Sequence, residues 1–516
     1  MSQIKLMGRA GLVVSGTRAE LCEAVAAQAQ VRHMSKTAEK TLSLETLNPR
    51  IIKLQYAVRG PLVIRAAQIR AEIEKGAKKP FKTVISANLG DAQAMQQLPI
   101  TFIRQVIACS VYPDLLKSSE FPADVKDRAK AILKSCAGQL SVGAYTASYG
   151  MDMIRKHVAD YIECRDGHPA KWEDICCCAG ASNGIKHCLE MFCNKVGGKD
   201  TGVMIPIPQY PLYSATLAEY GLGQVGYYLD EDKGWVLDVK ELERALRDAS
   251  DKYAVRALVV INPGNPTGQV LKKENIQEII KFAKKHTLMV FADEVYQDNV
   301  YAQDSSFHSF KKVMTEMGAP YNTIELASFM SISKGYMGEC GFRGGWMELC
   351  NLDPKVQAHL YKAISAMLCP STIGQIVVDC IARTPLPGEP SYDQWACEKA
   401  TTLESLAERA KMIVETFNKM DGFKCNIVQG AMYAFPRISL PKRAVEAAGK
   451  AGVPADSFYA KQLLEETGIC IVPGSGFGQR PGTYHFRTTI LPQPKLLQEM
   501  LDIFKSFHQK FTKEYS

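Results

Sequence analysis

The sequence predicts an α/β fold, a mostly parallel sheet covered by helices on both faces, followed by a smaller α+β C-terminal lobe. Between about residues 150 and 350, short apolar runs alternate with helical stretches such as 151–163 and 274–285. Continuous apolar runs in such an alternation are typical of strands buried on both faces of a parallel sheet. The length of 516 residues also exceeds what one compact core accommodates, which favours two lobes.

The expected strands are the apolar runs bounded by turn residues at 175–179, 202–207, 257–261, 288–292, 324–329 and 345–349. Upstream, residues 51–74 predict a loop followed by an amphipathic helix, and 84–90 a short strand that ends on glycine. Long helical patterns at 353–368 and 392–420 flank the proline-rich segment TPLPGEP (384–390), a candidate hinge. The lobe after this hinge is expected to hold strands near 423–428, 432–438 and 469–472, and a last helix over 494–511.

These patterns divide the chain into a tail (1–41), an N-terminal arm with part of the small domain (42–90), a large domain (91–385) and a C-terminal small domain (386–516). The first residues alternate basic side chains with alanine-rich intervals, as a mitochondrial transit peptide does, but its acidic residues are atypical of one. A transit peptide and a flexible cytosolic tail both remain open. The expected compartment is therefore the cytoplasm or the mitochondrial matrix.

Composition argues against several classes of function. The net charge is only +8, and the basic residues are scattered in short pairs, so no nucleic-acid surface is expected. Because no run of about 18 apolar residues occurs, no membrane span is expected. The 16 cysteines form no C-x-x-C pair and, with the nine histidines, never cluster at ligand spacing. We therefore expect reduced, buried thiols and no metal site.

Small and polar residues follow the expected strands at the edge where such sheets bind ligands. Ala181, Ser182 and Asn183 follow the first strand and precede the helical pattern of 184–192, where free N–H groups and the helix dipole attract an anion. An ordinary helix cap is the alternative. Prolines fix Tyr210 after the second strand, which either offers its ring to a flat ligand or packs on a turn. The rigid loop NPGNPTG (262–268) presents Asn265 after the third.

The next two strand ends carry charge. Asp293, in DEVY with Tyr296, directly follows an apolar strand and needs a cationic partner to be buried there. Residues 331–345, SISKGYMGECGFRGG, surround Lys334 with small residues, and a desolvated lysine amine is a nucleophile that forms Schiff bases. Arg343 in the same stretch has the planar fork suited to phosphate, and Arg487 lies in the strand-like YHFRTTIL (484–491). A structural ion pair is the alternative for Asp293 and for Arg487.

Taken together, these residues describe one ligand. It is anionic at one end, facing Ser182, Ser331, Ser333 and Arg343. It also has a flat ring, an atom that needs an acidic partner, a polar oxygen and an electrophilic carbon near a lysine. Pyridoxal 5′-phosphate has all of these features.

The motifs NPGNPTG, DEVY and SxSKGxxGxxGxRxG occur in this order, and with them the chain resembles the fold type I pyridoxal-phosphate aminotransferases. Within these it resembles the alanine aminotransferase family over about residues 42–516. The matching stretches are YAVRGPLV (56–63), NLGDAQAM (88–95), PIPQYPLYSATLAE (206–219), ADEVYQDNVY (292–301), SKGYMGECGFRGG (333–345), LLEETGICIVPGSGFGQ (463–479) and GTYHFRTTILP (482–492).

The resemblance implies a mostly parallel seven-stranded sheet and a role for each singled-out residue. Lys334 would hold the cofactor as an aldimine and act as the base, and Asp293 would pair with the ring nitrogen. The other implied cofactor ligands are Asn265 and Tyr296 at the ring oxygen, Tyr210 on the ring, and Ala181, Ser182, Asn183, Ser331, Ser333 and Arg343 around the phosphate. Arg487, with Gly90 and Asn265, would bind the substrate carboxylate. Tyr145 would reach the neighbouring subunit's cofactor in a homodimer with shared active sites.

The implied reaction moves the amino group of L-alanine to 2-oxoglutarate by a ping-pong mechanism, giving pyruvate and L-glutamate. One alternative is another fold type I enzyme, such as an aromatic aminotransferase or a cysteine-conjugate β-lyase. A second is a non-catalytic regulatory protein on this fold, although Lys334 and Asp293 are both present. Tyr149 stands where a small residue is expected and would crowd the site entrance or be tolerated. Arg59 is a candidate for binding the second carboxylate of glutamate.

Overall fold

The computed structural model describes residues 40–56, 60–139 and 141–516. The chain divides after Lys53 into two units. The described part of the first unit contains the short helix α2 (Pro49–Lys53). The second unit, Leu54–Ser516, contains the sheets and the longer helices and is described by itself below.

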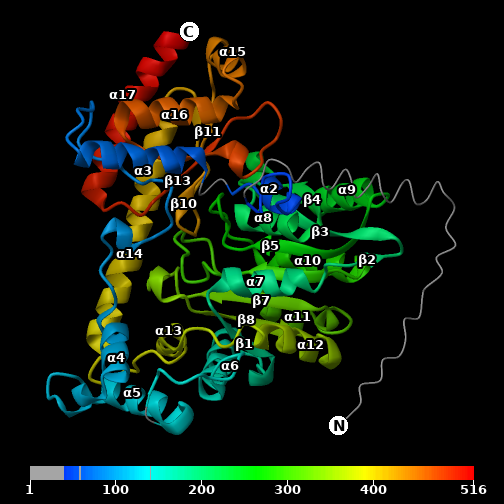
Figure 1. Cartoon of the computed structure of the whole chain (residues 1–516), viewed down its shortest axis with the longest axis vertical. Helices are drawn as coiled ribbons and strands as arrows, with labels where there is room; N and C mark the ends of the chain where they lie inside the picture. The colour runs from blue at the N-terminus through cyan, green and yellow to red at the C-terminus, as the bar shows by residue number, and fades with distance from the viewer. Residues whose placement is uncertain (1–39, 57–59, 140) are drawn as a thin grey trace, which may run out of the picture. The chain divides into compact units, whose positions relative to one another are not determined.

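Within the described residues, the second unit is built around an eight-stranded sheet in the order β1-β8-β7-β6-β5-β3-β2, with β4 also paired to β3 (Figure 1). The strands are β1 (Ile175–Cys178), β2 (Lys195–Val196), β3 (Lys199–Ile207), β4 (Gly223–Tyr228), β5 (Tyr253–Ile261), β6 (Met289–Asp293), β7 (Leu326–Ser331) and β8 (Gly345–Cys350). Strands β3 to β7 pair with one another in parallel. The two-residue β2 is antiparallel to β3, and β8 is antiparallel to both its neighbours, β1 and β7. The mostly parallel sheet is thus confirmed, with β2 added to the seven strands expected.

The apolar runs form strands because both faces of the sheet are covered. In β5, Ala257 and Val259 point into one apolar cluster, whereas Leu258 and Val260 point into another on the opposite face. Successive side chains of a strand alternate between faces, so a strand buried on both sides needs apolar residues at every position. This explains why the strands have no polar alternation in the sequence.

Helices pack on both faces of the sheet (Figure 1). On the first face lie α7 (Ala181–Glu190), α8 (Pro211–Tyr220) and α12 (Pro354–Ser365). On the second lie α6 (Asp152–Asp166), α9 (Val239–Ala249), α10 (Lys273–His286), α11 (Phe310–Met317) and α13 (Thr372–Ala382), with α4 (Thr101–Val111) and α5 (Ala123–Ser135) packed beyond α13. The helices connecting parallel strands place the strand ends at a common edge.

The C-terminal part forms a lobe with its own small sheets. One has the order β10-β13-β12, and the other pairs β11 with β9. The strands are β9 (Phe423–Lys424), β10 (Tyr433–Ala434), β11 (Arg437–Ile438), β12 (Val472–Pro473) and β13 (Phe486–Thr489), and the helices are α14 (Tyr392–Asn418), α15 (Lys442–Lys450), α16 (Ala455–Thr467) and α17 (Pro494–Tyr515). Helix α3 (Pro61–Glu74) packs on α16, so the N-terminal arm joins this lobe.

Two details differ from the sequence prediction. Residues 84–90 form no named strand, because only Ile85 pairs, through a single bridge to Ile469. Strand β4 was missed, because GQVGYY contains two glycines and lacks an apolar run. The domain boundaries after residues 41, 90 and 385 stay predictions. In the described part of the chain, no helix is both long and apolar enough to cross a membrane.

Phe329→Ala is expected to lower the free energy of unfolding by about 3–5 kcal/mol. Phe329 lies fully buried in the central strand β7, with its ring 5.8 Å from that of Phe291, and its removal leaves a cavity that rigid strands cannot close. Urea denaturation measures the change. Leu98→Ala is the control, because Leu98 is 81% exposed and should cost little. Equal costs for the two variants would contradict the placement of Phe329 in the core.

Candidate active site

The strand ends converge on a cavity of about 590 Å³. Twelve of the sixteen residues that the sequence singled out line it: Gly90, Ala181, Ser182, Tyr210, Asn265, Asp293, Tyr296, Ser331, Ser333, Lys334, Arg343 and Arg487. Most come from the carboxyl ends of β1, β3, β5, β6 and β7, as expected for a parallel sheet. Gly90 and Arg487 instead come from the N-terminal arm and from β13, so two distant parts of the chain close the cavity.

Asp293 ends β6 on the face covered by α8 and is only 4% exposed. Its Oδ2 accepts a hydrogen bond from the Tyr213 hydroxyl at 2.9 Å, whereas its buried Oδ1 has no hydrogen-bond partner among the described residues. Burial raises the pKa of this carboxyl to about 6, although Tyr213 and the Lys334 ammonium oppose the shift. A buried carboxylate oxygen in this position suits a protonated ring nitrogen.

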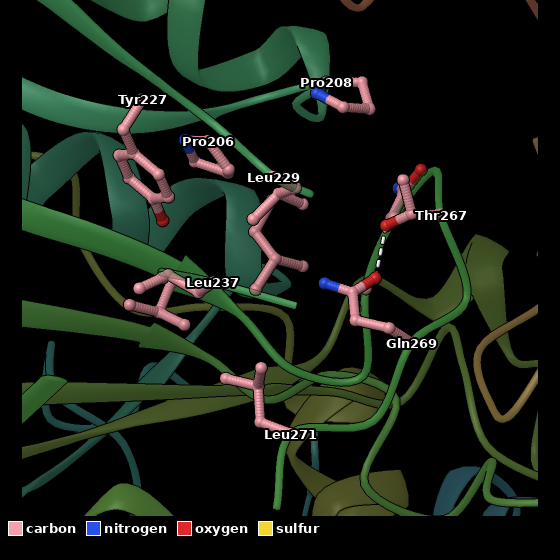
Figure 2. Close-up of a pocket in the computed structure, with 12 residues that line it drawn as sticks. Pro206, Pro208, Tyr227, Leu229, Leu237, Thr267, Gln269 and Leu271 are labelled. Atoms are coloured by element: carbon pink, nitrogen blue, oxygen red, sulfur yellow. Dashed lines mark hydrogen bonds between the residues drawn. The ribbon is translucent and has the colours of Figure 1, made fainter. Parts of the chain in front are cut away.

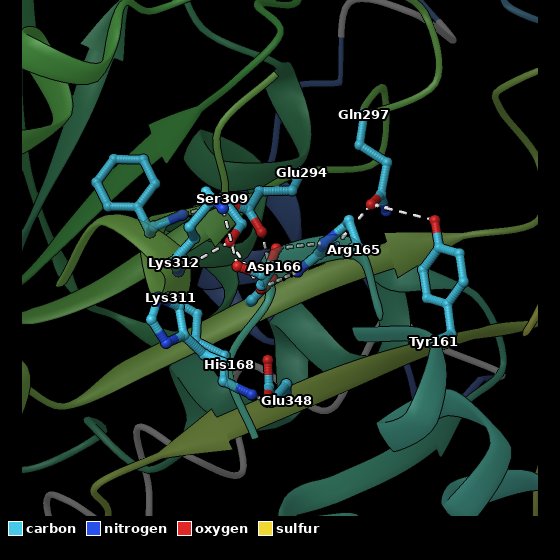
Figure 3. A network of polar contacts seen from close by, with 12 residues as sticks. Tyr161, Arg165, Asp166, His168, Glu294, Gln297, Ser309, Lys311, Lys312 and Glu348 are labelled. Carbon is cyan, nitrogen blue, oxygen red and sulfur yellow. Dashed lines mark hydrogen bonds and ion pairs between the residues drawn. The ribbon is translucent and has the colours of Figure 1, made fainter. Parts of the chain in front are cut away.

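Glu294, the next residue, points to the opposite face of the sheet and supports the end of β6 (Figure 3). Its Oε1 accepts from the Phe310 N–H at 2.8 Å and its Oε2 from the Ser328 hydroxyl at 2.5 Å. Arg165 lies beside it, joined by two hydrogen bonds of 2.8 Å to Asp166. The DEVY motif therefore directs one carboxylate into the cavity and anchors the other in a buried polar network.

Lys334 follows β7 and points into the cavity. Its Nζ donates to the Gly90 carbonyl at 2.8 Å and lies 5.7 Å from the centre of the Tyr296 ring. Ser333 lines the cavity beside the amine, whereas most glycines of this segment serve close packing: an added Cβ at Gly344 or Gly345 would lie 2.4 Å from a backbone oxygen. The amine is thus held by a neutral oxygen and stays available for chemistry.

An anion cradle lies at the other end of the cavity. In the described part of the chain no side chain caps the N-terminus of α7 at Ala181 and Ser182, so its N–H groups are available to a ligand. Arg343 donates from Nη1 to Ser333 Oγ at 3.3 Å and from Nη2 to Ala179 O at 3.1 Å. At Gly180, with φ of +84°, an added Cβ would lie 2.4 Å from the Arg343 guanidinium. Glycine is therefore required for the arginine to reach the helix N-terminus, and the group suits phosphate.

Arg487 is a buried cation with neutral partners. It is 1% exposed, donates from Nη1 to Asn265 Oδ1 at 3.2 Å and from Nη2 to the Asn88 carbonyl at 2.7 Å. Among the described residues its Nε has no hydrogen-bond partner. A guanidinium held by neutral oxygens in a cavity retains its capacity to bind a carboxylate.

Hydrogen bonds hold the loop that carries Asn265, and one of them joins Thr267 and Gln269 (Figure 2). The Thr267 hydroxyl donates to Gln269 Oε1, and Asn262 Oδ1 accepts from the Leu271 N–H at 2.9 Å. These bonds fix the turn between β5 and residue 271 without using the Asn265 side chain. Asn265 is thereby free to orient Arg487.

Sequence reasoning missed three tyrosines at the site. Tyr433 and Tyr56 line the cavity, and the Tyr56 hydroxyl lies 3.0 Å from that of Tyr210. Tyr213, which stands with Tyr210 in PQYPLY (208–213), donates a hydrogen bond to Asp293. The aromatic-rich sequence around each of them is equally typical of a hydrophobic core. Only the proline-bounded turn that Tyr213 shares with Tyr210 indicated a place in the site.

Four other expected residues lie elsewhere or outside the description. The Asn183 side chain points along α7 to His187, 3.1 Å away, and lines a different cavity. Tyr145 is 73% exposed and does not line the cavity of its own subunit. Tyr149 stacks on Tyr361 at 5.2 Å, so it does not crowd the cavity. Arg59 lies outside the described residues.

The donor set fits pyridoxal 5′-phosphate. The unpartnered Asp293 oxygen suits the ring nitrogen, Lys334 the carbonyl carbon, and the α7 N-terminus with Arg343 the phosphate. Among the described residues, no three histidine, cysteine or acidic side chains converge as a metal site requires. The described cysteines are free thiols.

The chain is similar in sequence and in fold to known proteins. The family model for aminotransferase class I and II matches residues 114–504. The chain is 55% identical to alanine aminotransferase 1 of Bos taurus over 480 residues, 93% of this chain and 97% of that protein. It is 45% identical to the probable alanine aminotransferase, mitochondrial, of Dictyostelium discoideum, over 93% of this chain and 91% of that one. An alanine aminotransferase structure from Pyrococcus furiosus has the same fold, with a TM-score of 0.70, 22% identity, and coverage of 90% of this chain and 99% of that one.

Asp293→Asn is expected to stabilise the cofactor-free protein at neutral pH. The folded-state pKa of about 6 lies above the ordinary 3.8, so the protonated carboxyl favours the fold and this contribution is lost as pH rises through about 6. The loss is on the order of 3 kcal/mol. In urea denaturation from about pH 4 to pH 8, the free energy of unfolding of the variant should increase relative to that of the parent as pH rises.

Asp160→Asn, an exposed change on α6, controls for the lost charge. If Asp293→Asn kept the pH dependence of the parent, burial of an unneutralised carboxylate at the end of β6 would be contradicted.

Proposed function

The chain belongs to the class I and II aminotransferases, and we propose that it transfers the amino group of L-alanine to 2-oxoglutarate, giving pyruvate and L-glutamate. As an aminotransferase the protein uses pyridoxal 5′-phosphate and acts on amino acids and 2-oxo acids. The convergence of Lys334, Asp293 and Arg487 on one cavity carries the proposal, because it places a base, a ring-nitrogen partner and a carboxylate receptor together. The choice of alanine rests on the relatives that bear that name.

Each residue then has a stated task. When bound, the cofactor withdraws electrons from the Cα of the amino acid joined to it. Asp293 Oδ1 holds the ring nitrogen protonated, because a buried carboxylate is stabilised by a cationic partner. Several residues that line the cavity would hold the cofactor: Ala181, Ser182, Ser331, Ser333 and Arg343 its phosphate, Asn265 and Tyr296 its ring oxygen, and Tyr210 its ring face.

Arg487 and Lys334 act on the substrate itself. Arg487 binds the α-carboxylate through its planar fork and so fixes the direction of the Cα–H bond. The Lys334 amine takes the Cα proton and holds it on Nζ, from which it would pass to the cofactor carbon on the other side of the amino nitrogen. The amino group would stay on the bound cofactor when the first 2-oxo acid leaves. The second substrate therefore enters only afterwards, which predicts ping-pong kinetics.

The proposed assembly is a homodimer with shared active sites. Tyr145 supports it, because its side chain is exposed and lies outside the cavity of its own subunit. In a dimer its hydroxyl would reach the phosphate held by the neighbouring subunit. The proposed compartment is the cytoplasm or the mitochondrial matrix, and the name of the Dictyostelium relative contains the word mitochondrial.

The visible absorption of the purified protein tests the proposal. L-Alanine alone should convert the band of the bound aldehyde cofactor into that of its amine form, and 2-oxoglutarate should restore the first band. A cofactor band that alanine leaves unchanged would refute the substrate and keep the family.

Lys334→Ala is expected to reduce turnover by at least about 10²–10⁴-fold, because no other amine in the described lining can take the Cα proton. Turnover of alanine measures the loss. Lys273→Ala is the control, because Lys273 lies on α10 in an ion pair with Glu316 at 2.7 Å, outside the cavity. Full activity of Lys334→Ala would contradict the role of Lys334 as the base that takes the Cα proton.

Arg487→Lys is expected to raise the KM for alanine about 10- to 100-fold, because an ammonium cannot reproduce two parallel hydrogen bonds to a carboxylate. Arg409→Lys is a matched control: Arg409 is a buried arginine of α14 that bonds the Leu491 carbonyl outside the cavity. An unchanged KM in Arg487→Lys would move the carboxylate site elsewhere.

A further inference from the structure

Tyr433 lies between the two cations that act on the substrate. It is buried on β10, lines the cavity and pairs with Thr489 of β13. Arg487 stands two residues before Thr489 and so shares its side of the strand. The guanidinium carbon of Arg487 lies 4.1 Å from the Tyr433 ring centre and 4.9 Å from that of Phe477. The carboxylate receptor is therefore held between two aromatic rings.

The hydroxyl end of Tyr433 reaches the other cation. A Cβ added at Gly90 would lie 1.8 Å from the Tyr433 hydroxyl and 3.0 Å from Lys334 Nζ. The hydroxyl therefore packs directly on the Gly90 backbone, whose carbonyl accepts from Lys334 Nζ at 2.8 Å. One side chain thus contacts the Arg487 guanidinium with its ring and, with its hydroxyl, the Gly90 backbone that accepts from the Lys334 amine.

The surrounding charges favour an electron-rich oxygen on Tyr433. Burial raises the pKa of its phenol, but the Lys334 ammonium, the Arg487 guanidinium and the Tyr296 hydroxyl outweigh burial and lower it overall, against the Cys340 thiol. For Tyr296, burial and the neighbouring Tyr433 raise the pKa. Of the two phenols, Tyr433 is therefore the one whose oxygen faces the two cations and holds its own proton less tightly.

We propose that Tyr433 is a positioning residue for both cations: its ring orients Arg487 for the substrate carboxylate, and its hydroxyl holds the Gly90 carbonyl where the free Lys334 amine rests. This inference rests on the proposed function. It assigns the ring to substrate binding and the hydroxyl to proton transfer. The two contributions are separable because different variants remove them.

Tyr433→Phe keeps the ring and removes the hydroxyl. Its kcat with alanine is expected to fall about 2- to 10-fold with KM unchanged, because the free amine loses a contact that fixes it. The kinetic isotope effect of alanine deuterated at Cα should increase, because proton transfer then limits the rate more strongly. A purely structural role would move neither quantity selectively.

Tyr433→Leu removes the ring as well. The probe is 2-methylalanine, which has the amine and carboxylate of alanine but no Cα hydrogen, so it binds without reacting. Its dissociation constant from the holoenzyme, followed by cofactor absorption, should rise about 2- to 30-fold in Tyr433→Leu. It should stay at the parent value in Tyr433→Phe.

Tyr459→Phe is the matched control, since Tyr459 is a fully buried tyrosine of α16 whose hydroxyl lies 3.1 Å from His508 Nδ1, away from the cavity. It should keep the parent values. An unchanged kcat and isotope effect in Tyr433→Phe would overturn the role of the hydroxyl, and unchanged binding of 2-methylalanine in Tyr433→Leu that of the ring. If the parent protein does not turn over alanine, the proposed function itself is refuted. A failure of the proposed function can therefore be distinguished from a failure of the role of Tyr433.

Discussion

The site depends on burying two opposite charges without pairing them with each other. Asp293 and Arg487 line one cavity, and each is almost entirely withdrawn from water. A buried charge without a counter-charge is costly, and the fold reduces the cost with neutral hydrogen-bonding groups. Tyr213 donates a hydrogen bond to Asp293, and Arg487 donates hydrogen bonds to Asn265 and to the Asn88 carbonyl. Neutral partners orient a charge without cancelling it, so both remain available to a ligand.

Topology keeps the two charges separate. Asp293 ends a strand of the large sheet, whereas Arg487 lies on β13 of the small three-stranded sheet. The cavity therefore exists only where the two sheets meet, and Lys334 lies between them with its amine on the Gly90 carbonyl. The proposed order of the site, with a ring-nitrogen partner, a base and a carboxylate receptor, follows from this arrangement of elements.

Residues directly after a buried strand were predictable, because parallel topology brings strand ends to one edge. Asn265, Asp293 and Lys334 come together for this reason. Asn183 was misplaced because α-helical geometry turns each residue by about 100°, which points its side chain along the helix to His187, four residues on. Tyr433 could not be found, because its role depends on the docking of β10 against the N-terminal arm, and its apolar neighbours look like ordinary core.

A pocket that serves both alanine and glutamate must receive either a methyl group or a carboxylate. A fixed cation facing the side chain would be left unpaired whenever alanine is bound, which would weaken that half of the reaction. In the described lining the cations are Lys334, Arg343 and Arg487, and the proposed mechanism uses all three elsewhere. The remaining polar groups include the hydroxyls of Tyr56 and Tyr210, 3.0 Å apart, which satisfy each other when no ligand oxygen is near. A neutral pair of this kind tolerates a methyl group at little cost, whereas a permanent charge does not.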